Sequence, residues 1–163
     1  MYQDYKDLLS AFRAHGVRYL VVGAYAVIYH AQPRFTKDMD LFIKADPANA
    51  QATYAALAAF GAPLLGIRAE DFAERGSFFR FGHDPHSFDI LPDIPGVDFE
   101  AAWARRVEGV IDPKGGLKAF FISASDLIAS KLASGRLQDL ADAEAVRKAA
   151  EAQPRQPAKE PPA

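Results

Sequence analysis

The sequence predicts a single α/β or α+β domain in which helices and short strands alternate. At 163 residues the chain is long enough for one domain with a proper core and too short for two. Half of its residues are hydrophobic and 12% are aromatic, which is typical of a globular chain. Apolar runs with strand character alternate with segments whose apolar residues have helical spacing. We place the domain at residues 1–152.

The composition excludes several classes of protein. The chain has no cysteine, so disulfides, cysteine-based zinc sites and thiol catalysis are ruled out. The net charge of −2 gives no general attraction to nucleic acid or to an acidic membrane, so a polyanion would have to be held locally. No apolar run approaches the roughly 18 to 20 residues of a membrane span. The polar N-terminus is no signal peptide, and we expect a cytoplasmic protein with no membrane partner.

The first third of the chain predicts a helix, a strand and a second helix. Apolar residues at helical spacing predict a helix over residues 5–12, with a stop at Gly16. The β-branched and aromatic run at 17–22 predicts a buried strand. It ends at the small pair Gly23-Ala24, after which residues 25–30 are expected to form a short helix.

An acid-bearing strand and a long helix are predicted next. The strand lies in the stretch 36–43, and the dipeptide Asp46-Pro47 is a strong helix start, with an N-cap followed by proline. The helix continues through an alanine-rich stretch and stops at Gly61. Residues 62–76 predict a loop with a short helix around 71–73.

Two hairpins and three helices complete the prediction. Turn residues between apolar runs indicate hairpins whose strands span residues 77–81 and 87–91, then 107–111 and 117–122. Capping residues and glycine stops indicate helices over residues 98–103, 123–134 and 137–151. Residues 153–163 are rich in proline and charge and are expected to form a disordered tail.

Asp38 and Asp40 are the first candidate functional residues. Alternation along a strand places both carboxylates on one face, with Met39 and Leu41 on the other. Like charges side by side on a sheet repel each other, which favours a positive charge between them. A divalent cation with oxygen ligands would supply it. The alternative for such a pair taken alone is a solvated strand edge.

A third acid, Asp89, lies between Phe88 and Ile90 and therefore faces away from whatever those two side chains bury. Taken alone, it would be a solvent-facing strand residue. The small pair Gly23-Ala24 before a helix would let backbone N–H groups approach a phosphate. Carboxylates on neighbouring strands could then hold metal ions against that phosphate, and one could take a proton from an attacking hydroxyl.

These motifs resemble those of the DNA-polymerase-β-like nucleotidyltransferases. Val22-Gly23-Ala24 precedes Asp38-Met39-Asp40-Leu41 by a spacer of thirteen residues, and Phe88-Asp89-Ile90 is similar to the later strand that carries the family's third acid. A Val-Gly-Ala-Tyr-Ala run and a Lys-x-x-x-Gly-Arg-x-x-Asp segment from Lys131 to Asp139 look like those of small bacterial stand-alone members, of abortive-infection and minimal-nucleotidyltransferase type. The resemblance covers roughly residues 5 to 150.

The resemblance implies a mixed sheet flanked by helices and transfer of a nucleoside monophosphate from an NTP such as ATP. It implies Mg²⁺ or Mn²⁺ bound by Asp38, Asp40 and Asp89, with Asp89 also acting as general base or orienting the acceptor hydroxyl. Gly23 and Ala24 would contact phosphate through backbone N–H groups. Ala24 departs from the usual serine or second glycine, and the lost hydroxyl removes one hydrogen bond, roughly 1–2 kcal/mol.

Further nucleotide contacts are predicted at Lys131 and Thr36. Lys131 would reach the triphosphate from its helix, as relatives suggest, or be a solvated helix lysine. Thr36, with its neighbours Arg34 and Lys37, would touch nucleotide or acceptor, or form an ordinary polar loop.

Other conspicuous residues have simpler explanations. Arg136 and Asp139 are three apart on a helix, which predicts an ion pair within it. His83 and His86 lie in a predicted turn, where a metal site would need further ligands. Tyr25 and Tyr29 share a helix face and are expected in the core.

The predicted function is metal-dependent nucleotidyl transfer to a hydroxyl of RNA (such as a tRNA end), a protein or a small molecule. Relatives act in toxin–antitoxin or abortive-infection pairs, so a cognate toxin or antitoxin protein is a predicted partner. The alternative is a catalytically weak or inactive binding module of the same fold, antitoxin-like or regulatory, which Ala24 favours.

Overall fold

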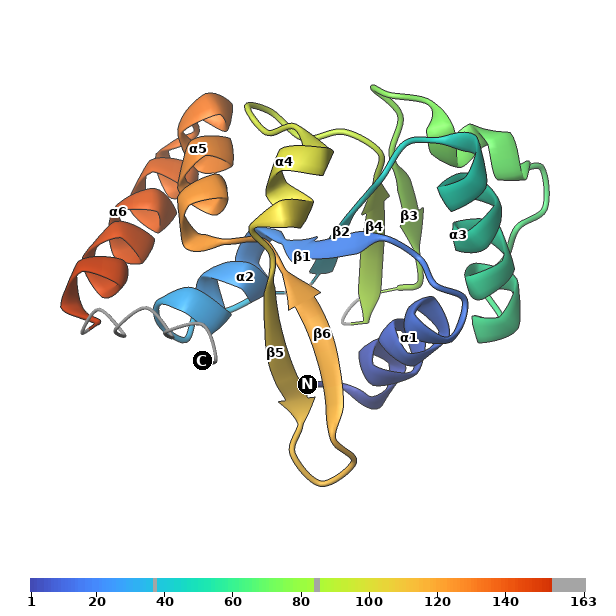
Figure 1. The fold of residues 1–163 in the computed structure, drawn as a ribbon, viewed down its shortest axis with the longest axis horizontal. Helices are drawn as coiled ribbons and strands as arrows, with labels where there is room; N and C mark the ends of the chain where they lie inside the picture. The colour runs from blue at the N-terminus through green and yellow to red at the C-terminus, as the bar shows by residue number, and fades with distance from the viewer. Residues whose placement is uncertain (37, 84–85, 154–163) are drawn as a thin grey trace, which may run out of the picture.

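A mixed six-stranded sheet with helices on both faces forms the centre of the molecule (Figure 1). The computed structural model describes residues 1–36, 38–83 and 86–153. Its helices are α1 (Gln3–Ala14), α2 (Gly23–His30), α3 (Pro47–Phe60), η1 (Ala69–Ala73), α4 (Phe99–Ala104), α5 (Ala124–Ser134) and α6 (Leu137–Ala152). Its strands are β1 (Tyr19–Val22), β2 (Asp38–Ile43), β3 (Phe79–Phe81), β4 (Ser87–Leu91), β5 (Val107–Asp112) and β6 (Leu117–Phe121).

The strand order β3-β4-β2-β1-β6-β5 combines both pairing modes. β2 pairs antiparallel with β1 and parallel with β4, and β1 pairs parallel with β6. The outer pairs, β3 with β4 and β5 with β6, are antiparallel hairpins. The central strands therefore bring together segments from both halves of the chain.

Each face of the sheet has its own apolar cluster. One cluster packs α1, α3 and η1 against alternate residues of β2, including Met39, Leu41 and Ile43. The other contains Phe42 of β2 and packs α2, α4, α5 and α6 on the opposite face. Since side chains alternate along a strand, Asp38 and Asp40 lie on the same face as Phe42, with α2, α5 and α6.

Residues that begin and end helices behave as their chemistry predicts. Asp46 caps α3 by accepting a hydrogen bond from the backbone N–H of Asn49 at 2.7 Å. Ser123 caps α5 through the N–H of Asp126. Gly61 and Gly135 end α3 and α5 in the left-handed conformation that glycine adopts without strain.

The structure confirms the predicted fold class, the mixed sheet and both hairpins. The first strand is shorter than predicted, because the N–H of Val17 bonds to α1 and that of Arg18 bonds to the Asn49 side chain. Helix α2 begins at Gly23 itself, so the predicted Gly23-Ala24 turn is the first part of a helix.

Three parts of the predictions fall outside the described residues: Lys37, positions 84–85 of the first hairpin turn, and the tail beyond Gln153. The domain limit at residue 152 therefore stays a prediction. None of the helices in the described residues is both long and apolar enough to span a membrane.

Asn49 links the start of α3 to two strands and generates a stability prediction. Its buried side chain accepts from the N–H of Arg18 at 2.8 Å and donates to the carbonyls of Arg18 and Lys44 at 3.1 and 2.9 Å. Asn49→Ala leaves these backbone groups without their partner. We expect a loss of about 2–3 kcal/mol in the free energy of unfolding, measured by urea denaturation.

Asp46→Ala is the matched control, because it removes the α3 cap and leaves the Asn49 bridge to the strands intact. Its expected cost is about 1 kcal/mol. An Asn49→Ala cost no larger than that of the control would contradict the role given to Asn49.

Candidate active site

The register of two parallel strands brings the predicted acids together. β2 and β4 pair so that Asp40 lies opposite Asp89 and Asp38 lies opposite Ser87. Phe88 and Ile90 belong to the apolar cluster on the α1 and α3 side, so Asp89 projects to the other face, with Asp40. Three carboxylates thus lie on one face of two adjacent strands.

Asp40 lies against the first residue of α2. A Cβ built on Gly23 would come within 2.2 Å of the Asp40 Oδ2 atom, and Gly23 has a φ of +63°. Glycine is therefore required there both by its backbone conformation and by the contact. Burial, followed by the charges of Asp89 and Asp38, raises the pKa of Asp40 to about 7. A cation beside Asp40 would favour its charged form.

Asp38 is oriented by hydrogen bonds from neighbouring elements. The Ser87 hydroxyl donates to its Oδ1 atom, and the Thr36 hydroxyl donates to its backbone carbonyl at 3.0 Å. Tyr5 of α1 in turn donates to the Ser87 carbonyl at 2.7 Å. Because β4 holds the Ser87 hydroxyl, the position of Asp38 depends on the pairing of β2 with β4.

Asp89 is buried, with 7% of its surface exposed, and Arg80 of β3 covers it. The Arg80 Nε and Nη2 atoms donate to the two carboxylate oxygens of Asp89 at 2.8 and 3.0 Å. The same Nη2 lies 3.6 Å from the Asp38 Oδ2 atom. Arg80 is therefore the direct partner of one acid and a neighbour of a second.

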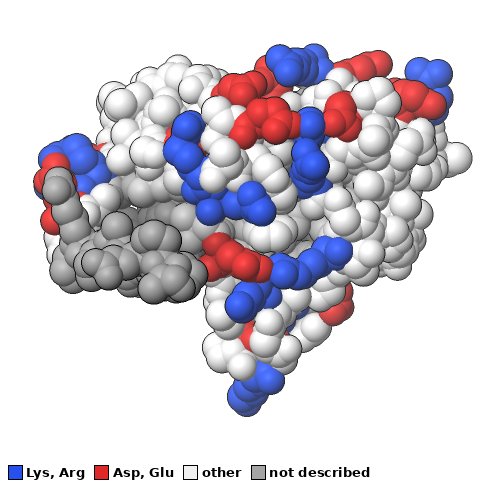
Figure 2. Space-filling view, in the orientation of Figure 1, with Lys and Arg blue, Asp and Glu red and all other residues white. Residues whose placement is uncertain are grey.

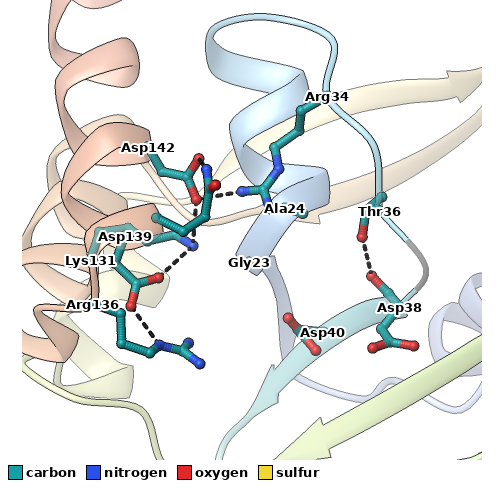
Figure 3. A pocket seen from close by; sticks show the side chains of 11 residues that line it. Gly23, Ala24, Arg34, Thr36, Asp38, Asp40, Lys131, Arg136, Asp139 and Asp142 are labelled. Atoms are coloured by element: carbon teal, nitrogen blue, oxygen red, sulfur yellow. Dashed lines mark hydrogen bonds and ion pairs between the residues drawn. The ribbon is translucent and has the colours of Figure 1, made fainter.

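A pocket of about 290 Å³ opens between β2, the start of α2 and the α5–α6 pair (Figure 3). Figure 3 shows Asp38 and Asp40 on the strand side of this pocket and Lys131, Arg136, Asp139 and Asp142 on the helix side. Its lining residues are Gly23, Ala24, Arg34, Thr36, Asp38, Asp40, Lys131, Arg136, Gln138, Asp139 and Asp142.

Ion pairs fix the cations on the helix side. Lys131 of α5 lies 3.3 Å from Asp139 and 3.0 Å from Asp142, and only 13% of its side chain is exposed. Arg34, in the loop before β2, bonds to Asp142, and Arg136 bonds to Asp139 at 2.8 Å.

These ion pairs determine the pKa of Asp139. Burial alone would raise the pKa of Asp139, but hydrogen bonds from Arg136, Ser134 and Lys131 lower it to about 2. Asp139 is therefore ionised at neutral pH and holds its cations in place.

Six of the predicted site residues line this one pocket: Gly23, Ala24, Thr36, Asp38, Asp40 and Lys131. Asp89 is adjacent to Asp40 in the sheet but lies behind Arg80, outside the pocket lining. The solvated-edge alternative for the acid pair is wrong, because β2 lies between β1 and β4. The solvent-facing alternative for Asp89 is also wrong, as its burial shows.

The simpler explanations of other residues are partly confirmed. Lys131 is an ion-paired lysine rather than a solvated one. Arg136 and Asp139 form the predicted ion pair, and both also line the pocket. Tyr25 packs against the core cluster on the α1 side, whereas Tyr29 is half-exposed and stacks on Phe121 at 4.2 Å between ring centroids.

Sequence reasoning missed the roles of Arg80, Ser87 and Asp142, and also that of Gln138, whose amide donates to the Asp142 carboxylate at 2.9 Å. A signal for Arg80 was present, since it lies between Phe79 and Phe81 as Asp89 lies between Phe88 and Ile90. In a predicted hairpin, that alternation places an arginine on the same face as the acid. No comparable local pattern linked Asp142 to Arg34, which is 108 residues away in the sequence.

The donor chemistry of the pocket fits a divalent metal ion on its strand side. Asp38 and Asp40 offer carboxylate oxygens, which Mg²⁺ and Mn²⁺ prefer. Within the described ranges, no group of three or more histidine, aspartate or glutamate side chains is already arranged to hold a metal ion. The third acid is instead occupied by Arg80.

Comparisons with known proteins show the fold and the family of the chain. A crystal structure of the lincosamide antibiotic adenylyltransferase LnuA, bound to lincomycin, is similar with a TM-score of 0.57 and 18% identity, covering 91% of this chain and 98% of that chain. That likeness shows a shared fold. Comparison with curated proteins gives no match. The model of a family described as nucleotidyltransferases of unknown function, DUF6036, matches residues 3–151. Because this match spans nearly all of the chain outside its C-terminal end, the chain belongs to that nucleotidyltransferase family.

Proposed function

We propose that this protein transfers a nucleoside monophosphate from an NTP to a hydroxyl acceptor with the help of Mg²⁺ or Mn²⁺. The observation that carries the proposal is a pocket with two acids on its strand side and with Lys131 and Arg136, ion-paired to Asp139 and Asp142, on its helix side. A triphosphate with a bound divalent cation is complementary to this pocket. Its cation binds carboxylates, and its phosphate oxygens bind lysine and arginine side chains. An NTP substrate also fits the expected cytoplasmic location.

The chain's residues have distinct roles in this proposal. Lys131 and Arg136 bind phosphate oxygens from the helix side, and backbone N–H groups at Gly23 and Ala24 bind them at the start of α2. Thr36 orients Asp38 through the backbone hydrogen bond described above. Asp38 and Asp40 would hold the divalent cation, which when bound neutralises charge on the triphosphate and on the departing pyrophosphate.

The reaction is a substitution at the α-phosphorus. The acceptor oxygen forms a bond to that phosphorus, the bond to the β-phosphate's bridging oxygen breaks, and pyrophosphate leaves with its electron pair. The acceptor's proton passes to a carboxylate, for which Asp89 is the proposed base or orienting group. The position of Asp89 opposite Asp40 in the sheet supports this role, because it sets the two carboxylates side by side.

The acceptor is proposed as a hydroxyl of RNA, a protein or a small molecule. On the face shown in Figure 2, acidic and basic side chains are interspersed, and no broad basic surface covers it. This favours an acceptor held locally at the pocket over a long nucleic acid bound along that face. A role in a toxin–antitoxin or abortive-infection pair, with a cognate protein partner, belongs to the same proposal.

Two observations favour a second candidate, a catalytically weak or inactive module that binds nucleotide or a partner. Ala24 lacks the hydroxyl of the serine, or the flexibility of the glycine, that is usual at this position. The Asp89 carboxylate is already bound by Arg80. Such a module would bind an NTP and Mn²⁺, and its melting temperature would rise by mass action without any group transfer. Thermal melting beside the transfer assay separates the two candidates.

The transfer assay is the first test. NTPs labelled at the α-phosphate are incubated with the protein, Mg²⁺ or Mn²⁺, and tRNA, lysate protein or small hydroxyl compounds. We expect label transfer that falls about 100-fold or more in the Asp38→Asn/Asp40→Asn double variant. Asp7→Asn, which neutralises an exposed acid of α1, is the control and should leave transfer unchanged. Transfer that survives in the double variant would rule this site out.

Lys131→Gln tests the helix side of the pocket. Loss of the ammonium group should raise the KM for the NTP about tenfold or more, with a smaller change in kcat, because ground-state phosphate contacts are lost. Lys148→Gln neutralises an exposed lysine of α6 and should leave both constants unchanged. Equal KM values for the Lys131 variant and the wild type would remove Lys131 from the phosphate site.

Gly23→Ala tests the contact between α2 and Asp40. We expect a loss of stability of about 1–3 kcal/mol from the positive φ, and more from the clash with Asp40. Gly16→Ala is the matched control, because Gly16 has φ of +66° with no atom near its missing Cβ. Urea denaturation measures both variants, and equal costs would show that Asp40 moves aside freely.

A further inference from the structure

Arg80 lies between two of the acids that the proposed function assigns to metal binding. Its guanidinium donates to both carboxylate oxygens of Asp89 and approaches Asp38 from the same Nη2 atom. This two-pronged geometry is the strongest arrangement between arginine and a carboxylate. A cation of the chain itself therefore stands at the position where a metal ion would join Asp38 to Asp89.

Strand register holds Arg80 at this position. Arg80 lies directly opposite Asp89 in the antiparallel β3–β4 pair, and Asp40 lies opposite Asp89 in the parallel β2–β4 pair. The three residues form one row across neighbouring strands on one face of the sheet. Any side chain at position 80 with sufficient length would meet Asp89 first.

In this ion pair Asp89 is held in a buried position, whereas the Arg80 side chain has room to rotate into solvent. The Asp89 side chain is 11% exposed, whereas that of Arg80 is 56% exposed and comes from the short edge strand β3. Rotation of the arginine into solvent would disturb none of the apolar cluster, since neither cluster contains it. A guanidinium cannot lose its charge at ordinary pH, so Asp89 becomes available only when Arg80 moves away.

A divalent cation and the guanidinium exclude each other at Asp89. Metal ligation requires carboxylate oxygens at about 2.0–2.6 Å from the ion. A metal ion at that distance from an Asp89 oxygen would lie only a few ångströms from Arg80 and be repelled by it. The cations that line the pocket do not replace Arg80, because Lys131 and Arg136 are paired with Asp139.

We propose that Arg80 is a built-in counter-cation that competes with the divalent metal ion for Asp38 and Asp89. The inference rests on the proposed function, which supplies the metal site at Asp38 and Asp40. In the metal-free protein Arg80 balances the acids and keeps Asp89 out of the pocket. A metal ion binds Asp89 only after Arg80 has released this carboxylate. Arg80 therefore sets the metal concentration at which Asp38, Asp40 and Asp89 all bind the metal.

The test measures binding of Mn²⁺ alone to the full chain by electron paramagnetic resonance. We expect Arg80→Gln to lower the Kd for Mn²⁺ about tenfold or more. The change removes both a charge that repels the metal ion and a cation that competes with it for the carboxylates. Arg80→Lys keeps the charge but loses the two-pronged bond, and should lower the Kd by a smaller factor. Circular dichroism melting confirms that each variant is folded.

Two controls separate competition at Asp89 from a general change in charge. Arg18→Gln removes a half-exposed arginine that contacts Glu100, and should leave the Kd unchanged. Most of the gain from Arg80→Gln should disappear in the Asp89→Asn background, since the acid that it mainly frees is then absent. A gain of the same size there would assign the effect to overall charge and overturn the proposal.

The remaining outcomes distinguish this inference from the proposed function. If the wild type binds Mn²⁺ and Arg80→Gln binds it equally or more weakly, Arg80 is only a structural partner of Asp89 and the proposed metal site stands. If neither binds Mn²⁺, the metal site itself is wrong and the inference fails with it. If Arg80→Gln does not fold, the Arg80→Lys variant is the test. A Kd for Mn²⁺ in Arg80→Lys equal to that of the wild type would then overturn the proposal.

Discussion

The parallel pairing of β2 with β4 is the constraint on which the rest of the site depends. Its register sets Asp40 beside Asp89 and Asp38 beside Ser87, so one face of the sheet carries three carboxylates within two strands. Such a concentration of like charge beside an apolar cluster is unfavourable unless it is balanced. Burial, together with the neighbouring acids, raises the pKa of Asp40, and Arg80 balances the charge of Asp89.

On the helix side of the pocket, the positions of the cations are set by the need to neutralise buried acids. Asp139 and Asp142 are buried on α6, where unpaired charges would be costly, and Lys131, Arg136 and Arg34 compensate them. Through Asp142, the C-terminal helix also holds the loop that leads into the acid strand. The pocket is therefore built from both ends of the chain, and its two sides are linked by one set of ion pairs.

Much of the fold could be predicted from the sequence because its signals are local. Capping residues such as Asp46 and glycine stops such as Gly61 act within one helical turn, and they set the ends of α3 as predicted. The candidate residues lining the pocket were also predicted, but through short motifs and a family resemblance. The start of α2 was placed two residues too late: the helix begins at Gly23, although the positive φ of Gly23 is that of a turn and not of a right-handed helix.

The charge balance of the site was only partly open to prediction. The predicted hairpin carried a signal for Arg80, but its exact partner depends on strand register, and the contacts of Asp142 depend on helix packing. Arg80 reaches Asp89 only because β3 pairs with β4, and Asp142 reaches Arg34 only because α6 packs beside α2. Both contacts join an acid to a cation from another element, and both involve residues at or beside the proposed nucleotide site. In the proposed function, a substrate that carries its own metal ion and phosphates would therefore meet charges that already have partners on both sides of the pocket. On the strand side, the proposed metal ion would displace Arg80 from Asp89. On the helix side, Lys131 and Arg136 are already held by buried acids and would not need to move.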